Sequence, residues 1–329
     1  MHFDFLLCSE RSGSNLITQL LNAHPEVCAP FPSHLLLRVG RHAWRYGDLA
    51  RDGAWELLLG DVADYLDAMH STWSKTPTAA ELAAAASGRT FADVFRAAYE
   101  ILAAHEGKGR VFVKDNHAAE DFGQIEAAFE AHRYLFVVRD PRDMAMTWRD
   151  NAMEPGGVAA AAACWLGDQT ASLRVLSALG PRGRAMLLRF EDLVTEPEAS
   201  MRRVCGFLGL DYTPAMLDFH RDPLLQHNAA SLSSWTDLAR PIDPSVVGRF
   251  RTRLSGSEVR YIEAVCGEQM AVFGYPRDHE APGDARALRS SLPDGADGVP
   301  EAAEVAIFDR WYAVRDRIAT RTPPRLAAD

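Results

Sequence analysis

The N-terminal segment combines an apolar strand, a glycine-containing loop and a helix, and this combination constrains the fold most strongly. The apolar run from Phe3 to Cys8 indicates a buried strand, and apolar residues recur at helical spacing from Leu16 to Leu21. The loop between them, Ser9 to Asn15, directs free backbone N–H groups and the positive end of a helix dipole at one point. The segment therefore predicts an anion site, such as a phosphate site, in an α/β protein.

The side chains of this loop suit an anion but not a magnesium nucleotide. Gly13 lets the backbone approach the anion, Ser12 and Ser14 offer hydroxyl donors, and Arg11 is the strong cation. Nucleotide triphosphatases end the loop with Gly-Lys-Ser or Gly-Lys-Thr, whereas this chain has Gly13-Ser14-Asn15. The chain thus lacks the lysine and the magnesium-binding hydroxyl that ATP-driven phosphoryl transfer uses, which argues against that reaction. Taken alone, the loop is equally compatible with a tight turn and a solvated Arg11.

Further apolar runs predict the remaining strands of a central parallel sheet. These runs are Arg110 to Lys114, Tyr134 to Val138 and Ala185 to Phe190, and each has a helical stretch beside it. A helix from about residue 198 to 208 should end at Gly209. Alternation of strands and helices places the chain in the α/β class.

The chain divides into one large domain and a tail. Residues 1–278 form the domain, and within it residues 35–108 are a helical insertion rich in Ala, Leu and Trp that should cover the sheet edge on the acceptor side. Residues 279–300 are dense in Pro, Gly, Asp and Ser and indicate a linker. Residues 301–329 contain a helix that should pack on the body or on a partner, such as a second copy of the chain.

Composition excludes several classes of function. The formal net charge of −10 over 329 residues argues against a nucleic-acid partner, which needs a field of Lys and Arg. Five scattered cysteines without metal-ligand spacing indicate reduced thiols and no metal site. The N-terminus lacks the features of a secretory signal, and no segment has membrane-spanning length. We therefore expect a cytoplasmic protein without membrane contact.

A second candidate anion site follows the third predicted strand. Arg139 leaves the carboxyl end of this strand, and Thr147 follows in the next helix. A guanidinium and a hydroxyl placed in this way can converge on one phosphate. Taken alone, this segment is better explained as a surface turn with charged residues. Together with the first loop it indicates a ligand with two phosphates.

Three segments together resemble the sulfotransferases that use 3′-phosphoadenosine 5′-phosphosulfate (PAPS). The segments are CSERSGSNLI, VVRDPRDMAMT and LRFEDLVTEPEASMRRVCGFLGL, in the order of that family, and the resemblance covers about residues 3–275. It is closest to the branch that includes tyrosylprotein and polyketide-associated sulfotransferases. The resemblance implies a three-layer sandwich like that of P-loop nucleotide hydrolases.

The resemblance also implies which residues bind PAPS and its product 3′-phosphoadenosine 5′-phosphate (PAP). Two groups of residues would hold the two phosphates, and three more would complete the nucleotide site. The residues that would bind the 5′ phosphosulfate are Arg11, Ser12, Gly13, Ser14 and Asn15. Those that would bind the 3′ phosphate are Arg139 and Thr147, and those that would make the remaining contacts are Phe190, Ser234 and Arg249.

Sulfuryl transfer is an in-line displacement that requires cations at the sulfate and a base for the acceptor proton, but in principle no metal. Arg11 should stabilise the departing oxygen, and Lys114 matches a strand-end lysine that relatives direct at the sulfonate. Tyrosylprotein sulfotransferases place a catalytic Glu where this chain has Pro32. His34 and His117 are the candidate bases instead, because an imidazole titrates near neutral pH.

Glu10 is a weaker third candidate base, since its carboxylate would repel the donor phosphates. Two other functions stay open, a P-loop kinase-like enzyme and a catalytically silent scaffold that binds PAP. The acceptor would be a small molecule or a carrier-bound hydroxyacyl group, less readily an amine. Trp44, Trp55 and Trp73 of the insertion should help to build its pocket.

Overall fold

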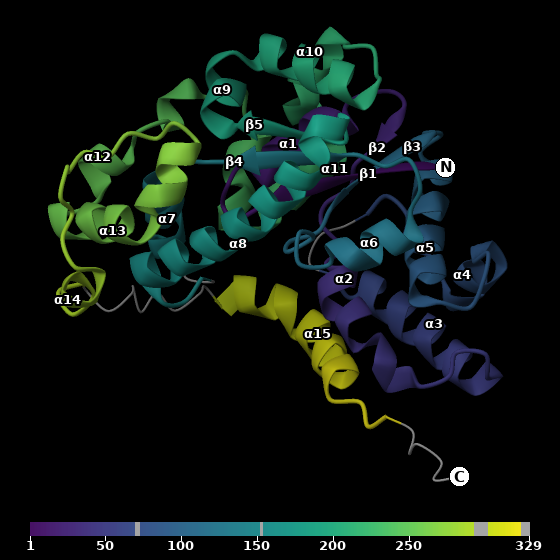
Figure 1. The fold of residues 1–329 in the computed structure, drawn as a ribbon. Coiled ribbons are helices and arrows are strands. Elements are labelled where there is room, and N and C mark those ends of the chain that lie inside the picture. Colours follow the sequence, from purple (N-terminus) through teal and green to yellow (C-terminus); the bar gives the residue numbers. More distant parts are fainter. Residues whose placement is uncertain (70–72, 152–153, 293–301, 324–329) are drawn as a thin grey trace.

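A five-stranded, wholly parallel sheet forms the centre of the protein (Figure 1). The computed structural model describes residues 1–69, 73–151, 154–292 and 302–323, without the side chains of 233–234 and 302–305. The strands are β1 (His2–Cys8), β2 (Val27–Cys28), β3 (Arg110–Lys114), β4 (Tyr134–Val138) and β5 (Ala185–Arg189), in the order β2-β3-β1-β4-β5. The predicted α/β class with a central parallel sheet is confirmed.

Helices cover both faces of this sheet, as Figure 1 shows. Helices α1 (Ser14–Asn22) and α10 (Pro197–Leu208) lie on one face, and α6 (Phe122–Ala128) and α8 (Gly157–Leu179) lie on the other. The strands are therefore buried on both sides, which explains why they appear in the sequence as unbroken apolar runs. The edge strand β2 has two residues and was not predicted, because so short a strand leaves no pattern.

The strand order creates a crevice at the carboxyl end of β1. Strands β1 and β4 are adjacent, but the chain continues from β1 through α1 to β2 at one edge and from β4 through α8 to β5 at the other, so the two connections diverge. Ligands of open α/β sheets bind in such a crevice. It brings together three segments that are distant in the sequence: the loop after Cys8, the end of β3 at Lys114, and Arg139 after β4.

The predicted helical insertion consists of four α-helices and one 3₁₀ segment: α2 (Leu35–Arg38), η1 (Gly40–Tyr46), α3 (Asp52–Asp67), α4 (Ala79–Ala85) and α5 (Phe91–His105). Helices α4 and α5 begin at capping boxes in which Thr78 and Thr90 bond reciprocally with the third helical residue. Trp55 and Trp73 are buried in the core between these elements. The insertion therefore has its own apolar packing.

The rest of the domain carries helices that follow the second half of the sheet. They are α7 (Pro141–Arg149), α9 (Phe190–Thr195), η2 (Gly180–Arg182), η3 (Pro214–Arg221), α11 (Pro223–Ser231), η4 (Ser233–Ala239), η5 (Pro244–Val246), α12 (Phe250–Arg253) and α13 (Gly256–Val272). Helix α10 ends at Gly209 in the left-handed conformation, as predicted. All five cysteines are free thiols.

The C-terminal helix α15 (Ala302–Ala319) returns to the body of the protein and lies against α2 and α3 (Figure 1). Phe308, Trp311 and Ile318 bury its apolar side. The short helix α14 (Ala285–Arg289) lies within the predicted linker, whose residues 293–300 are outside the described part of the chain. No helix among the described residues is both long and apolar enough to cross a bilayer.

Candidate functional site

A cavity of about 590 Å³ lies at the carboxyl ends of β1, β3 and β4 and extends to α15. Most of the predicted site residues line it together, although they come from segments spread over the whole chain. These are Arg11, Gly13, Ser14, Asn15, His34, Lys114, His117, Arg139, Thr147, Phe190 and Arg249. The predicted second anion site and the first loop thus share one cavity.

The loop after β1 has a strained backbone that turns it toward this cavity. Arg11 and Gly13 both have positive φ, 58° and 83°, and Gly13 directly precedes α1. A non-glycine residue in this region costs free energy, and such strain gathers at functional sites. No side chain caps the N-terminus of α1, so its first N–H groups stay available to a ligand.

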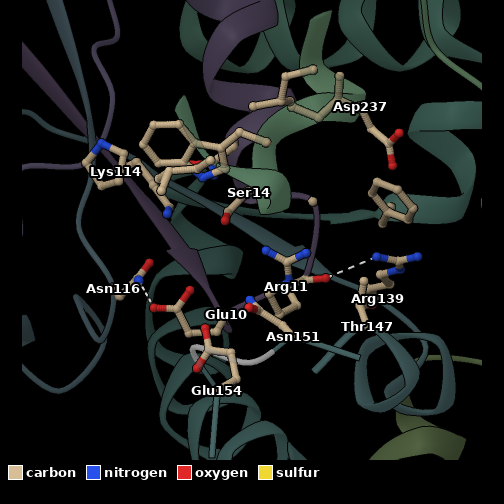
Figure 2. Close-up of a pocket in the computed structure, with 18 of the residues that line it drawn as sticks. Glu10, Arg11, Ser14, Lys114, Asn116, Arg139, Thr147, Asn151, Glu154 and Asp237 are labelled. Atoms are coloured by element: carbon tan, nitrogen blue, oxygen red, sulfur yellow. Dashed lines mark hydrogen bonds between the residues drawn. The ribbon is translucent and has the colours of Figure 1, made fainter. Parts of the chain in front are cut away.

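Arg11 and Arg139 lie next to each other across the loop (Figure 2). Nη1 of Arg139 donates a hydrogen bond of 3.1 Å to the carbonyl oxygen of Arg11, and its guanidinium stacks 4.5 Å above the Phe190 ring. Burial lowers the pKa of both arginines. The Nε atom of each is buried and bonds to nothing in the described structure, and neither guanidinium forms an ion pair there. Both guanidinium groups line the cavity, so their charges can bind a ligand there.

Lys114 adds a third cation from the end of β3. Its side chain is 3% exposed, yet the ammonium makes no hydrogen bond or ion pair with any residue that the structure describes. A buried charge without a partner is costly, and an anionic ligand would remove that cost. Arg11, Lys114 and Arg139 therefore form a cationic lining that fits a ligand with several negative charges.

The helix after β4, α7, carries a buried arginine and a threonine that faces the cavity. Arg142 is buried and forms ion pairs with Asp140 and Glu263, at 2.7 and 2.8 Å, so it serves the interior. Thr147 faces the cavity one helical turn beyond Asp143 and donates its hydroxyl hydrogen bond to the Asp143 carbonyl. This hydroxyl oxygen remains able to accept, and its proton can be redirected to a ligand.

Asp143 fixes the segment that carries Arg249. Its carboxylate accepts hydrogen bonds from the backbone N–H groups of Gly248 and Phe250, at 2.6 and 2.9 Å. Arg249 then pairs with Asp243 at 2.8 Å and bonds to Ser245 at the cavity mouth. Its guanidinium is thus partly neutralised, unlike those of Arg11 and Arg139.

Two of the predicted cofactor-binding side chains, those of Ser12 and Ser234, are not seen in the described lining of the cavity. The Ser12 hydroxyl is fully buried and donates to the carbonyl oxygen of Ser9 at 2.7 Å, so it stabilises the loop from within. The side chain of Ser234, in η4, is outside the described part of the structure. The roles assigned to these two residues stay predictions.

His34 precedes α2 in a left-handed backbone conformation, with φ of 54°. Its Nδ1 lies 3.8 Å from Oδ1 of Asp115, a fully buried carboxylate that also accepts from the Leu36 N–H at 2.9 Å. Burial raises the pKa of Asp115 to about 7. His34 also packs edge-on against Trp311 of α15, with ring centroids 6.4 Å apart. It therefore borders the α15 end of the cavity.

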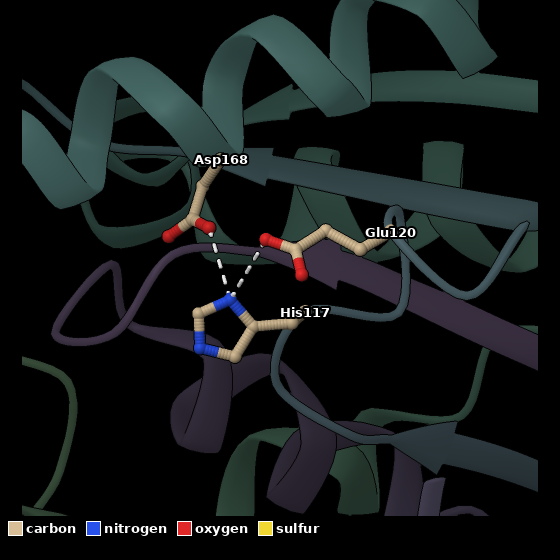
Figure 3. Close-up of side chains that lie close together, drawn as sticks. All are labelled: His117, Glu120 and Asp168. Carbon is tan, nitrogen blue, oxygen red and sulfur yellow. Dashed lines mark ion pairs between the residues drawn. The ribbon is translucent and has the colours of Figure 1, made fainter. Parts of the chain in front are cut away.

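His117 is held by two carboxylates (Figure 3). Its Nδ1 lies 3.3 Å from Asp168 and 3.5 Å from Glu120, and the Asp168 carboxylate is the chief cause that raises the His117 pKa. Ligand atoms of the three side chains lie within 4.8 Å of one another, so they could also surround a cation. The ion pair accounts for their positions, and it orients the imidazole beside the cavity.

Sequence reasoning missed two residues beside the cations, Asn116 and Glu154, and ranked Glu10 low. The Asn116 amide donates to the Glu10 carboxylate, and Figure 2 shows Glu154 next to them below Arg11. Burial, and then the charge of Glu10, raise the pKa of Glu154 to about 7. Glu154 lies in a segment between two helices and matches no motif, so no sequence signal pointed to it.

The aromatic wall of the cavity differs from the predicted one. Trp55 and Trp73 belong to the core and Trp44 is exposed, so none of them lines the cavity. Its aromatic lining comes instead from Phe190, Phe219 and Trp235 and from Phe308, Trp311 and Tyr312 of α15. The expectation for the insertion was wrong because aromatic side chains at helical spacing serve its own packing.

The fold and the cavity define an α/β protein with a cationic cavity at a loop–helix junction. Residues 5–214 match the model of the sulfotransferase family, and the chain belongs to this family. The resemblance inferred from the sequence motifs is thereby confirmed.

Two groups of known proteins are similar to this chain. Carbohydrate sulfotransferase 7 of Rattus norvegicus is 34% identical over 109 residues, 33% of this chain and 21% of that protein. Nodulation protein NoeE of Sinorhizobium fredii is 24% identical over 335 residues, 94% of this chain and 73% of that protein. The chain thus spans about a fifth of the length of the carbohydrate sulfotransferase that it matches.

Solved structures share the fold. A sulfotransferase domain from the curacin biosynthetic pathway superposes with a TM-score of 0.56 at 22% identity, over 82% of this chain and 97% of that one. A sulfotransferase domain from the Synechococcus PCC 7002 olefin synthase gives 0.51 at 21% identity, over 77% and 88%. At this level of identity the likeness concerns the fold alone.

Proposed function

We propose that the protein transfers a sulfuryl group from PAPS to a hydroxyl of a small-molecule or carrier-bound acceptor. One observation carries this proposal: Arg11, Lys114 and Arg139 face the same cavity from three strand ends, and no described carboxylate pairs with them. A donor with a 3′ phosphate and a 5′ phosphosulfate would use all three cations. A ligand with a single phosphate would leave part of this charge unpaired.

We propose the same division of roles among the cavity residues that the sequence motifs predicted. Backbone N–H groups around Gly13, with Ser14 and Asn15, would hold the 5′ phosphosulfate, while Arg139 and Thr147 would hold the 3′ phosphate. PAPS supplies an activated sulfuryl group whose leaving atom is a 5′-phosphate oxygen. Arg11 and Lys114 would stabilise the charge that develops on the oxygens around sulfur.

Phe190 and Arg249 would complete the nucleotide site. The Phe190 ring stacks under Arg139 and contacts the loop at Gly13, so it offers an apolar face beside both phosphate positions. Arg249 lies at the mouth, where its pairing with Asp243 can be exchanged for a ligand phosphate. The cofactor contact of Ser234 stays a prediction from the sequence.

The far end of the cavity would hold the acceptor. Trp311 and Tyr312 of α15 face it, together with Arg38 and Arg315. Such a surface favours an acceptor with an apolar or ring-shaped body. The resemblance of the sequence motifs to polyketide-associated sulfotransferases supports a carrier-bound acceptor, and carbohydrate sulfotransferase 7 supports a sugar hydroxyl.

Calorimetric titration with PAP, AMP and magnesium ATP tests the donor. We expect PAP to bind at least about tenfold more tightly than AMP, because AMP lacks the phosphate that Arg139 would hold. Equal affinities for PAP and AMP, or binding only to magnesium ATP, would favour the kinase-like alternative. Tight PAP binding without transfer to phenols, sugars or carrier-bound hydroxyacyl groups would favour the scaffold.

A further inference from the structure

Two carboxylates share the part of the cavity that holds Arg11 and Lys114. Glu10 belongs to the loop after β1, and Glu154 belongs to the segment between α7 and α8, where its backbone N–H donates to the Asn151 carbonyl at 3.0 Å. Figure 2 shows Glu154 close to Glu10 below Arg11. Both line the cavity, so an acceptor that approaches the sulfuryl group would meet them.

The two carboxylates are in different environments. Glu10 accepts a hydrogen bond from the Asn116 amide, which holds its carboxylate in place. Glu154 is near the negative charge of Glu10, which opposes its ionisation, while Arg11 and Lys114 favour it. Cys164 of α8 also lies near, but burial raises the pKa of its thiol and keeps it neutral. Two carboxylates in different environments are a recurrent arrangement for proton transfer.

We propose that Glu154 is the general base that removes the acceptor proton, and that Glu10 is a positioning residue that keeps Glu154 basic. The proposal rests on the proposed sulfuryl transfer from PAPS. In the step, the acceptor oxygen forms a bond to sulfur, and the bond from sulfur to the bridging oxygen breaks. The electron pair leaves on the 5′ phosphate of PAP, and the hydroxyl proton passes to Glu154.

The other candidate bases are engaged in different ways. His117 is bound through Nδ1 to Asp168 and Glu120, and His34 lies beside Asp115 and Trp311 at the α15 end. Glu154 differs because Arg11 and Lys114, the two cations assigned to the sulfuryl group, both act on its carboxylate. Burial and Glu10 raise the pKa of Glu154 to about 7, which suits a base at neutral pH.

The test measures PAP release from PAPS across pH, with phenol, which stays protonated below about pH 9, as the acceptor and with water alone. Glu154→Gln should lower kcat by about 10²–10⁴-fold, abolish the rise of the rate with pH, and leave PAP binding unchanged. Glu10→Gln removes a like charge, so the rising limb should move to lower pH while transfer persists. Glu268→Gln, on the exposed surface of α13, is the matched control.

Several outcomes would overturn the assignment of Glu154. One is a Glu154→Gln enzyme that keeps its rate within about tenfold and keeps the rising limb. Another is a pH–rate profile whose rising limb shifts in Asp168→Asn but not in Glu10→Gln. This result would assign the role of base to His117. Wild-type protein that binds PAP but never consumes PAPS would overturn both proposals. Failure to bind PAP at all would refute the donor itself, and calorimetry separates these cases.

Discussion

The ring of Phe190 occupies the space that a side chain on Gly13 would need. A Cβ atom at Gly13 would lie 2.2 Å from Cδ2 of Phe190, and the backbone there has φ of 83°. The close approach and the left-handed backbone both require glycine. Strand β5 thus restrains the anion loop of β1 through the residue that follows it.

Gly13→Ala should therefore damage the loop more than an ordinary surface substitution would. Overpacking against Phe190 and the positive φ should cost about 1–3 kcal/mol of stability and weaken PAP binding. The measurements are urea denaturation and calorimetry. Gly60→Ala in α3 meets no atom within 4 Å, so it should be neutral or stabilising. If Phe190→Ala does not relieve the defect of Gly13→Ala, the contact is not its cause.

Arg139→Ala should chiefly weaken the cofactor. The substitution removes the cation assigned to the 3′ phosphate, so we expect the Kd for PAP to rise by at least about tenfold and the Kd for AMP to change little. Titration calorimetry measures both. Arg203→Ala, on the exposed side of α10, is the control. Equal losses for PAP and AMP would mean that Arg139 acts through the Arg11 carbonyl and the loop.

Arg11→Ala should reduce transfer more than it reduces PAP binding. Its guanidinium is assigned to charge that develops at the leaving oxygen, so its removal should lower kcat by about 10²–10³-fold. Single-turnover measurements with labelled PAPS separate this effect from binding. Activity within about tenfold of wild type would refute the role.

Much of the sheet could be predicted because its strands are buried on both faces. Tyr134–Val138 and Arg110–Lys114 were predicted with the bounds that the structure has. The two-residue strand β2 could not be found, since pairing with β3 alone defines it. The packing of α15 against α3 could not be predicted either, because the amphipathic pattern of a helix does not identify the surface that the helix covers.

The site residues that could be predicted are those whose sequence motif fixes their place in the fold. Arg11, Gly13 and Arg139 follow strand ends, and parallel strands bring such ends to one edge. Glu154 follows no strand and becomes part of the site only because the fold places it below Arg11. The aromatic lining from α15 was missed for a similar reason. Such contacts depend on tertiary packing rather than on local pattern.

The buried carboxylate of Asp115 should make stability fall as pH rises. Burial raises its pKa to about 7, whereas an unfolded aspartate titrates near 3.9. Between about pH 4 and pH 7 the folded state therefore binds more protons than the unfolded state, and stability decreases through this window. Asp115→Asn keeps an acceptor for the Leu36 N–H and should flatten the dependence of Tm on pH. The exposed Asp218→Asn variant should keep the wild-type slope.

Helix α15 should depend on Asp61 for its attachment. This carboxylate, 5% exposed, accepts from the Tyr46 hydroxyl at 2.7 Å and pairs with Arg317 at 3.0 Å and with Arg321. Asp61→Asn should cost about 1.5–3 kcal/mol, because hydrogen bonds to a charged group are lost in a buried place.

The loss should be local and should reach the acceptor end of the cavity. We expect faster hydrogen exchange along residues 306–319 in Asp61→Asn and weaker acceptor binding, with PAP affinity unchanged. Asp67→Asn is the matched control, since Asp67 pairs with Arg310 on the same two helices, but both side chains are more than half exposed. Exposed pairs contribute little. Equal effects of the two variants would show that helix charge in general, and not the buried pair, holds α15 over the cavity.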